Sequence, residues 1–141
     1  MNHVIKEGFS AGRAAKLSGV PYRTLDYWAT SRFIVPSLVS AAGKGTRRLY
    51  SFPDLVALRV ARELRAAGIS LQALRKVVRH LRTRRKSASF ANSFLVSDGR
   101  DVFERRGEEL ISTLRQPGQM ASVWLVDLGY IVEELQRSIA V

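Results

Sequence analysis

Near the start of the chain, the apolar residues Ala14, Ala15 and Leu17 lie on one side of a predicted helix. Ser10 precedes this helix as a candidate N-cap, and Gly19 fits its C-terminal end, where a left-handed backbone is common. Pro21 suits the first turn of a second, short helix over residues 22–30, because a first-turn residue needs no N–H donor. The pattern therefore predicts two helices joined by a tight turn at residues 19–20.

Two further helices follow, and their ends are marked by cap residues. Ser51 is a candidate cap and Pro53 takes an early position in the third helix, while the stretch at residues 67–70 ends that helix and caps the fourth. The apolar stripes of the two helices are Leu55, Leu58, Val60, Ala61 and Leu64, and then Leu71, Leu74, Val77, Val78 and Leu81. The other face of the fourth helix is basic and carries Arg75, Lys76, Arg79 and Arg82.

A basic hairpin is predicted between the second and third helices. Residues 33–35 and 48–52 have strand character, and residues 36–46 between them form a long tip that contains two glycines and Lys44. A short second helix that projects from a tight turn can enter a DNA major groove. The hairpin beside it can lie along the phosphates, so this order of elements points to double-stranded DNA as the partner.

The hydrophobic period changes after a polar, basic segment at residues 84–92. The elements predicted beyond it are strand 94–96, turn 98–99, strand 102–103, helix 108–114, a break at 116–119, strand 122–126 and a last helix capped by Asp127. This β-β-α-β-α order describes a small α/β unit. Its three-stranded sheet leaves edges and an apolar face open, so we expect it to pair with a second copy.

These elements together predict a mainly α fold in two parts. Residues 1–83 form a winged helix-turn-helix domain of about four helices and a two-stranded wing. Residues 84–92 form a linker. Residues 93–141 form the small α/β domain, which we expect to serve dimerisation or effector binding.

Charge is distributed unevenly between the two parts. The net charge is +11, and residues 1–86 carry 18 Lys/Arg and 4 Asp/Glu, whereas residues 87–141 carry 5 and 8. The first part is therefore suited to a polyanion and the second is not. Charge alone would equally suit RNA or an anionic membrane, and the helix-turn-helix pattern is what selects double-stranded DNA.

Several classes of function find no support in the composition. The sequence has no cysteine, which excludes a disulfide framework and a thiolate metal site. His3 and His80 are isolated, and no nucleophile and base occur together, so we expect no metal site, no cofactor and no enzyme activity. The apolar runs are too short for a membrane span and the N-terminus lacks the apolar core of a signal peptide, which predicts a cytoplasmic protein.

A series of short motifs, taken together, resembles the MerR family of transcription regulators. The motifs are Ser10–Gly12, Ala15–Val20, Arg23–Leu25, Tyr27, Arg48–Tyr50, Asp54–Leu55 and Leu64–Leu71, in the family's order and spacing over about residues 8–82. The sequence is similar in particular to a branch with a small globular C-terminal domain. The resemblance implies a two-fold dimer on an inverted repeat. Many relatives bend and untwist an overlong promoter spacer, which makes RNA polymerase an expected partner.

Two positions depart from the family pattern. Asp26 stands where the family usually has arginine, and its carboxylate would repel phosphate unless it pairs with a nearby arginine, for example one from the wing. Trp28 replaces the usual second tyrosine and lacks its hydroxyl. The contacts that the family makes from these two positions are therefore not expected here.

Eight residues are predicted to contact DNA: Arg13, Lys16, Tyr22, Arg23, Tyr27, Lys44, Arg47 and Arg48. Tyr22 and Arg23 begin the second helix, where Arg23 is expected to contact a guanine edge or a phosphate. Tyr27 is expected to bind a phosphate through its hydroxyl, with a core position for its ring as the alternative. The family pattern favours Arg48 over Arg47 as the wing's phosphate contact. Arg13 and Lys16 on the first helix face either the DNA backbone or solvent.

Two other functions remain open at this point. The C-terminal domain of an antitoxin-type autorepressor would bind a partner protein, and a co-purifying small protein would favour that hypothesis. An architectural or excisionase-like protein would bend DNA at many degenerate sites instead of one inverted repeat. The effector is also open between a hydrophobic small molecule, another protein and none, and one sequence does not separate activator from repressor.

Overall fold

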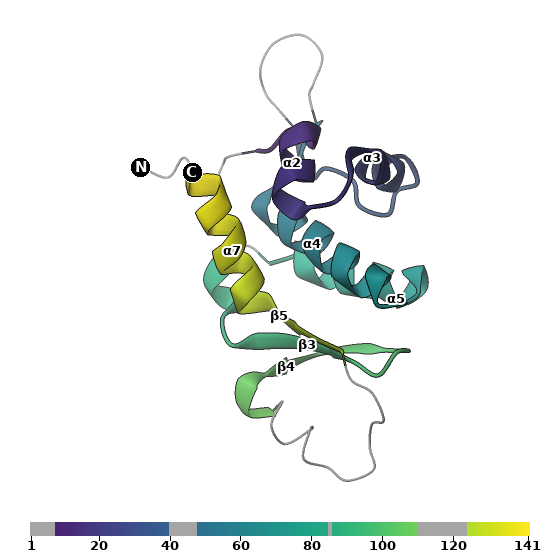
Figure 1. Cartoon of the computed structure of the whole chain (residues 1–141), viewed down its shortest axis with the longest axis vertical. Helices are drawn as coiled ribbons and strands as arrows, with labels where there is room; N and C mark the ends of the chain where they lie inside the picture. The colour runs from purple at the N-terminus through teal and green to yellow at the C-terminus, as the bar shows by residue number, and fades with distance from the viewer. Residues whose placement is uncertain (1–7, 40–47, 85, 110–123) are drawn as a thin grey trace.

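The structure, a computed structural model, describes residues 8–39, 48–84, 86–109 and 124–141. Helices α2 to α5 pack together, and a three-stranded sheet with α7 lies against them (Figure 1). The elements are α2 (Ala11–Ser18), α3 (Tyr22–Thr30), β1 (Leu38–Val39), β2 (Arg48–Leu49), α4 (Phe52–Ala66), α5 (Leu71–Arg82), the 3-10 helix η1 (Ser87–Phe90), β3 (Ser93–Ser97), β4 (Val102–Arg106), β5 (Trp124–Asp127) and α7 (Leu128–Ala140). The predicted fold class is confirmed: a mainly α, winged helix-turn-helix part is followed by a small α/β part.

The helix-turn-helix forms as the sequence predicts. The Ser10 hydroxyl accepts a hydrogen bond of 3.3 Å from the Arg13 N–H and so caps α2, and Gly19 ends the helix with φ +80°. Helix α3 spans residues 22–30 as predicted, and Pro21 is its N-cap. Leu25 and Trp28 direct one face of α3 into the core.

The first strand of the wing lies later in the chain than predicted. β1 pairs antiparallel with β2, with Leu38 opposite Leu49, so the strand predicted at residues 33–35 is wrong. Phe33 and Ile34 both donate their N–H groups to the Trp28 carbonyl, at 2.8 and 3.2 Å, and therefore complete the end of α3. Their side chains are buried, so their apolar character reflects core packing and not a strand.

The second strand is shorter than the predicted range 48–52. Tyr50 leaves the hairpin and exchanges two hydrogen bonds of 2.8 Å with Phe9, which precedes α2. Phe52 is already the first residue of α4, because Ser51 and Asp54 form a capping box. Residues 40–47, which make up most of the predicted tip, lie outside the described residues.

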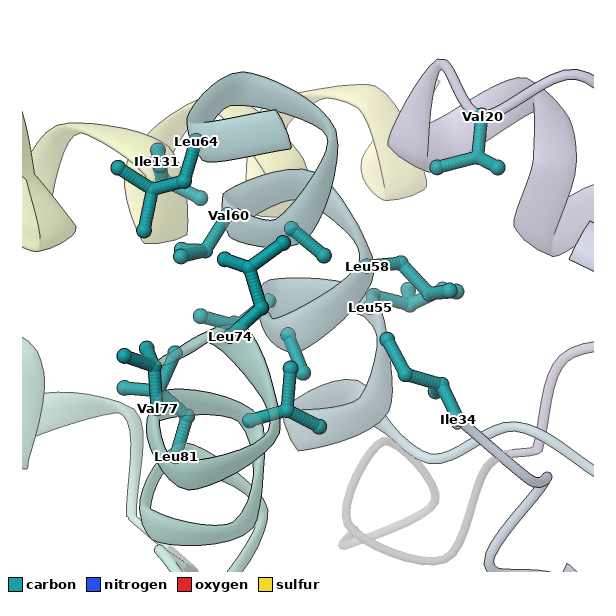
Figure 2. Close-up of a cluster of buried hydrophobic side chains, with 14 of the residues drawn as sticks. Val20, Ile34, Leu55, Leu58, Val60, Leu64, Leu74, Val77, Leu81 and Ile131 are labelled. Atoms are coloured by element: carbon teal, nitrogen blue, oxygen red, sulfur yellow. The ribbon is translucent and has the colours of Figure 1, made fainter. Parts of the chain in front are cut away.

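Helix α4 is the centre of the hydrophobic core. In Figure 2, Leu74 and Val77 of α5 lie on one side of α4, Ile34 lies on another, and Ile131 of α7 lies beside Leu64. The predicted stripes of α4 and α5 are buried with one exception. Leu71 is 37% exposed, because it is the first residue of α5 and lies at the end of the helix.

The C-terminal part is an antiparallel sheet in the order β4-β3-β5, with α7 packed against β3. The predicted hairpin is confirmed, and its strands are longer than expected, with Ser97 paired to Val102 across the connection. Asp127 caps α7 as predicted by accepting a 3.0 Å hydrogen bond from the Tyr130 N–H. The predicted helix 108–114 and the break at 116–119 fall largely outside the described residues.

One hydrophobic core connects both parts of the chain. Its buried residues include Leu64 of α4, Val126 of β5 and Ile131 of α7. Phe90 of η1, within the segment predicted as a linker, belongs to the same core. The domain boundaries stay a prediction, and the packing indicates that the two parts stabilise each other. In the ranges that the structure describes, no helix has the length and apolar character needed to cross a membrane.

Candidate nucleic-acid interface

The outer face of α3 carries exposed side chains suited to a DNA groove. Tyr22 is 58% exposed and Tyr27 is 65% exposed, and Arg23 is exposed beside them. The opposite face of α3 is buried through Leu25 and Trp28, and so the helix cannot turn these residues inward. The open alternative for Tyr27, a ring in the core, is thereby wrong, because its ring lies on the surface.

The turn before α3 depends on a glycine at position 19. Its φ of +80° lies in the left-handed region, and a Cβ there would lie 2.8 Å from the Arg62 guanidinium. Val20, the next residue, is buried in the core. Backbone conformation at Gly19 and burial at Val20 together fix where α3 begins relative to α2, and so fix the direction of the α3 outer face.

Asp26 and Trp28, the two departures from the family pattern, have different surroundings. Trp28 is buried and packs edge to face against Phe33, with ring centroids 5.1 Å apart, so a hydroxyl at this position would have no access to DNA. Asp26 is exposed on the same side of α3 as Tyr22 and Tyr27. No ion pair between described residues involves Asp26. Of the two wing arginines, Arg48 donates to the Pro36 carbonyl and does not pair with Asp26, and Arg47 lies outside the described residues.

The remaining predicted contacts lie on α2 and on the wing. Lys16 is exposed in the last turn of α2, and the guanidinium of Arg13 lies 5.2 Å from the centre of the Phe9 ring. Arg48 is exposed on β2 and donates a 3.1 Å hydrogen bond to the Pro36 carbonyl. Lys44 and Arg47 lie outside the described residues. Six of the eight predicted residues are therefore described, and all six are exposed on α2, α3 or β2.

Two basic residues near this surface were not predicted. Arg32 follows α3 with φ +66°, a conformation that a non-glycine residue rarely adopts, and its side chain is exposed. Nothing in its sequence context signals that backbone. Arg82 was assigned to the exposed basic face of α5, but it is half-buried and forms an ion pair with Asp54, with Nε and Oδ1 2.9 Å apart. The pair joins residues from different helices, which local sequence patterns do not reveal.

Two carboxyl groups affect the pKa of Tyr50, which is buried. Burial, followed by the charges of Asp54 and Asp26, raises the pKa of Tyr50 to about 12, although Arg82 opposes that shift. The Tyr50 hydroxyl therefore stays protonated to a higher pH than the hydroxyl of an exposed tyrosine. Within the described ranges, no cluster of three or more His, Asp or Glu side chains is arranged to hold a metal ion.

These elements define a winged helix-turn-helix protein. Residues 9–81 match the family described as MerR HTH family regulatory protein, which is more than half of the chain. The chain belongs to the MerR family.

Relatives in mycobacteria extend this comparison beyond the helix-turn-helix. Proteins of Mycobacterium bovis and of two strains of Mycobacterium tuberculosis, each named an uncharacterized HTH-type transcriptional regulator, are 44% identical to it over 112 residues. The match covers 79% of this chain and 49% of each relative, so the chain spans about half the length of the curated relatives it matches.

Proposed function

We propose that this protein is a sequence-specific DNA-binding transcription regulator. The observation that carries the proposal is the outer face of α3, where Tyr22, Arg23 and Tyr27 are exposed together. Arginine at the start of a recognition helix can donate two hydrogen bonds to a guanine edge, and tyrosine hydroxyls can bind phosphates. The name of the mycobacterial relatives, HTH-type transcriptional regulator, supports the same function for this chain.

Phosphate contacts are proposed to come from three elements. Arg13 and Lys16 supply them from α2, Tyr27 from α3, and Arg48 together with Lys44 and Arg47 from the wing. The excess of basic residues in residues 1–86 supports this arrangement, because it attracts the DNA before specific contacts form.

The active form is proposed to be a homodimer on an inverted repeat. Opposite residues of an antiparallel pair share a sheet face, so Phe103 and Leu125 flank Val96 on the face of the sheet that points away from Leu95 and Val126. Phe103 is 39% exposed and Leu125 is 50% exposed. We propose that this face is buried against a second copy, so that the dimer carries one α3 helix for each half-site.

The mode of action that we propose is bending or untwisting of promoter DNA, in the presence of RNA polymerase and in the cytoplasm. Contacts on two half-sites would offset the energy of deforming the DNA between them. We propose no enzyme activity and no cofactor for this role.

A salt-titrated binding experiment tests the function. The full-length protein is titrated against DNA from upstream of its own gene and against a scrambled fragment of equal length. A dimer with about 6–10 phosphate contacts should lose about 10³–10⁵ in affinity between 50 and 200 mM salt and keep its preference for the native fragment. Equal affinity for both fragments at every salt concentration would contradict sequence-specific regulation and would favour an architectural DNA-binding protein.

A further inference from the structure

The carboxylate of Asp54, which takes part in the capping box of α4, also accepts hydrogen bonds from outside that box. Its carboxylate is 1% exposed and accepts four hydrogen bonds, from the Ser51 N–H, the Ser37 N–H, the Ser37 hydroxyl and the Arg82 Nε, at 2.9, 2.9, 2.7 and 2.9 Å. The capping box needs only the bond from the Ser51 N–H. The other three bonds come from outside α4, so helix capping alone does not account for this carboxylate.

The donors belong to the two segments that carry the wing. Ser37 is the residue directly before β1, and Ser51 comes two residues after β2 ends. One carboxylate oxygen, Oδ2, accepts bonds from both of them, and the two serine hydroxyls also bond to each other at 3.0 Å. Both stems of the wing are therefore held at one point.

Arg82 adds the third connection, from the last residue of α5. Its guanidinium pairs with Asp54 and also donates a hydrogen bond to the Val35 carbonyl, in the first stem of the wing. Pro36, the next residue, accepts a hydrogen bond from Arg48. Three successive residues of this stem are thus bound: Val35 by Arg82, Pro36 by Arg48 and Ser37 by Asp54. Because Arg48 lies on β2, its bond also connects β2 to this stem.

We propose that Asp54 and Arg82 are positioning residues for DNA binding, which fix the wing against α4 and α5 so that Arg48 faces the phosphates. The part-buried pair holds both stems of the wing before DNA arrives, so binding does not have to order those stems. The inference rests on the proposed function for its consequence in DNA binding, but the anchoring itself can be measured without DNA.

The test compares Arg82→Met with Arg79→Met in the full-length protein. Both variants lose one arginine charge from α5. Arg82→Met leaves the Ser51–Asp54 capping box in place, because Arg82 is not part of it. Arg79 is exposed and serves as the control. Amide hydrogen exchange is measured at Ser37 and Ser51, with Leu58 and Ala61 in the interior of α4 as reference amides. We expect at least tenfold faster exchange at Ser37 and Ser51 in Arg82→Met, unchanged exchange at the reference amides, and wild-type exchange throughout Arg79→Met.

DNA binding supplies the second readout. In Arg82→Met, affinity for the native fragment should fall about tenfold, and the slope of log K against log salt should decrease by about 0.9 for each phosphate that the wing no longer binds. The ratio of affinities for native and scrambled DNA should stay unchanged, because α3 still reads the bases. Arg79→Met should weaken DNA binding less than Arg82→Met.

Three results would overturn the inference: unchanged exchange at Ser37 and Ser51, faster exchange at all four amides to the same extent, or local exchange with unchanged DNA affinity and salt slope. Absence of specific DNA binding by the wild type would instead refute the proposed function and leave the exchange result standing. If Arg82→Met does not fold because Asp54 is left without its counter-charge, Ser37→Ala replaces it. That variant keeps the ion pair and should show the same local effects with a smaller factor.

Discussion

The outer face of α3 and the outer face of the sheet are both exposed, but their chemistry differs. On α3 the exposed rings of Tyr22 and Tyr27 carry hydroxyls and flank Arg23. On the sheet, Phe103 and Leu125 offer no hydrogen-bonding atom. A surface that combines apolar area with hydrogen-bond donors suits phosphates and base edges. Exposed apolar side chains beside one charged group, the Arg105 guanidinium 5.4 Å from the centre of the Phe103 ring, suit another protein face. Polar content, and not exposure, therefore separates the proposed DNA face from the proposed dimer face.

The largest effect is expected at Ile131, where the C-terminal part of the chain packs against α4 of the N-terminal part. Ile131→Ala should lower the free energy of unfolding by about 2–5 kcal/mol, because it removes a buried side chain that packs against α4. Urea unfolding is followed by circular dichroism and by the fluorescence of Trp28 in a Trp124→Phe background. Both signals should shift together in one transition. Separate transitions would show that the N-terminal part is stable without the sheet and α7.

The α3 face is tested by Arg23→Ala. The variant should weaken binding to the native fragment by about 1–3 kcal/mol, because it removes the proposed hydrogen bonds to a base edge, while the unfolding transition and the dimer stay unchanged. Arg106→Ala is the matched control, since it removes an exposed arginine from β4. An equal decrease in affinity in both variants would mean that only total charge matters.

The sheet face is tested by Leu125→Glu, with Leu71→Glu as the control. Both replace an exposed leucine, at 50% and 37% exposure, by a charge. Leu125→Glu should raise the dimer dissociation constant about 10–100-fold in sedimentation equilibrium, because a carboxylate would be buried in the interface. Leu71→Glu should leave it unchanged. If only Leu71→Glu dissociated the dimer, the interface would involve α5 and not the outer face of the sheet.

The smallest effect concerns Glu104, which joins the sheet to the end of α5. Burial acts to raise its pKa, but hydrogen bonds from Arg84, Ser93 and His80 outweigh burial and lower the pKa below its usual range. The charged form is thus favoured in the folded state. Its stabilising contribution is complete above about pH 4.3, the unfolded value, and is lost as pH falls through the lower folded value.

Glu104→Gln should therefore destabilise the protein by about 1–2 kcal/mol at pH 7, and its difference from wild type should shrink as the pH falls below about 4. Urea unfolding at pH 7, 5, 4 and 3 measures this difference. Glu133→Gln, at an exposed position of α7, should show none at any pH. If the difference in the free energy of unfolding between wild type and Glu104→Gln stayed constant with pH, the charge of Glu104 would contribute nothing to stability.

The sequence predicts those parts of the fold that depend on local signals. The caps Ser10, Ser51 and Asp127 form in the structure, because a cap is satisfied within one helical turn. The strand predicted at residues 33–35 failed for the opposite reason. Phe33 and Ile34 are apolar because they fill the core beneath α3, and a short apolar run does not distinguish that role from a strand.

In the candidate site, too, the sequence predicts local features and misses contacts between distant residues. The burial of Leu25 and Trp28 leaves Tyr22, Arg23 and Tyr27 exposed on the other face of α3. The sequence left a core position open for the Tyr27 ring, and the packed structure excludes it. The pairing of Asp54 with Arg82 joins residues 28 positions apart. Its partners meet only after α4 packs against α5, and no spacing rule along the chain specifies that pairing.

The core that joins α4 to α7 also bears on how the protein is made. A chain leaves the ribosome from its N-terminus, at about 5–20 residues per second, and a domain folds when the residues of its core are available. Ile131 and Leu135 of α7 belong to the core around α4, so that core is incomplete until residues 128–140 have been synthesised. A translation product that ends before α7 would contain α3 and the wing but would lack part of the core against which they fold.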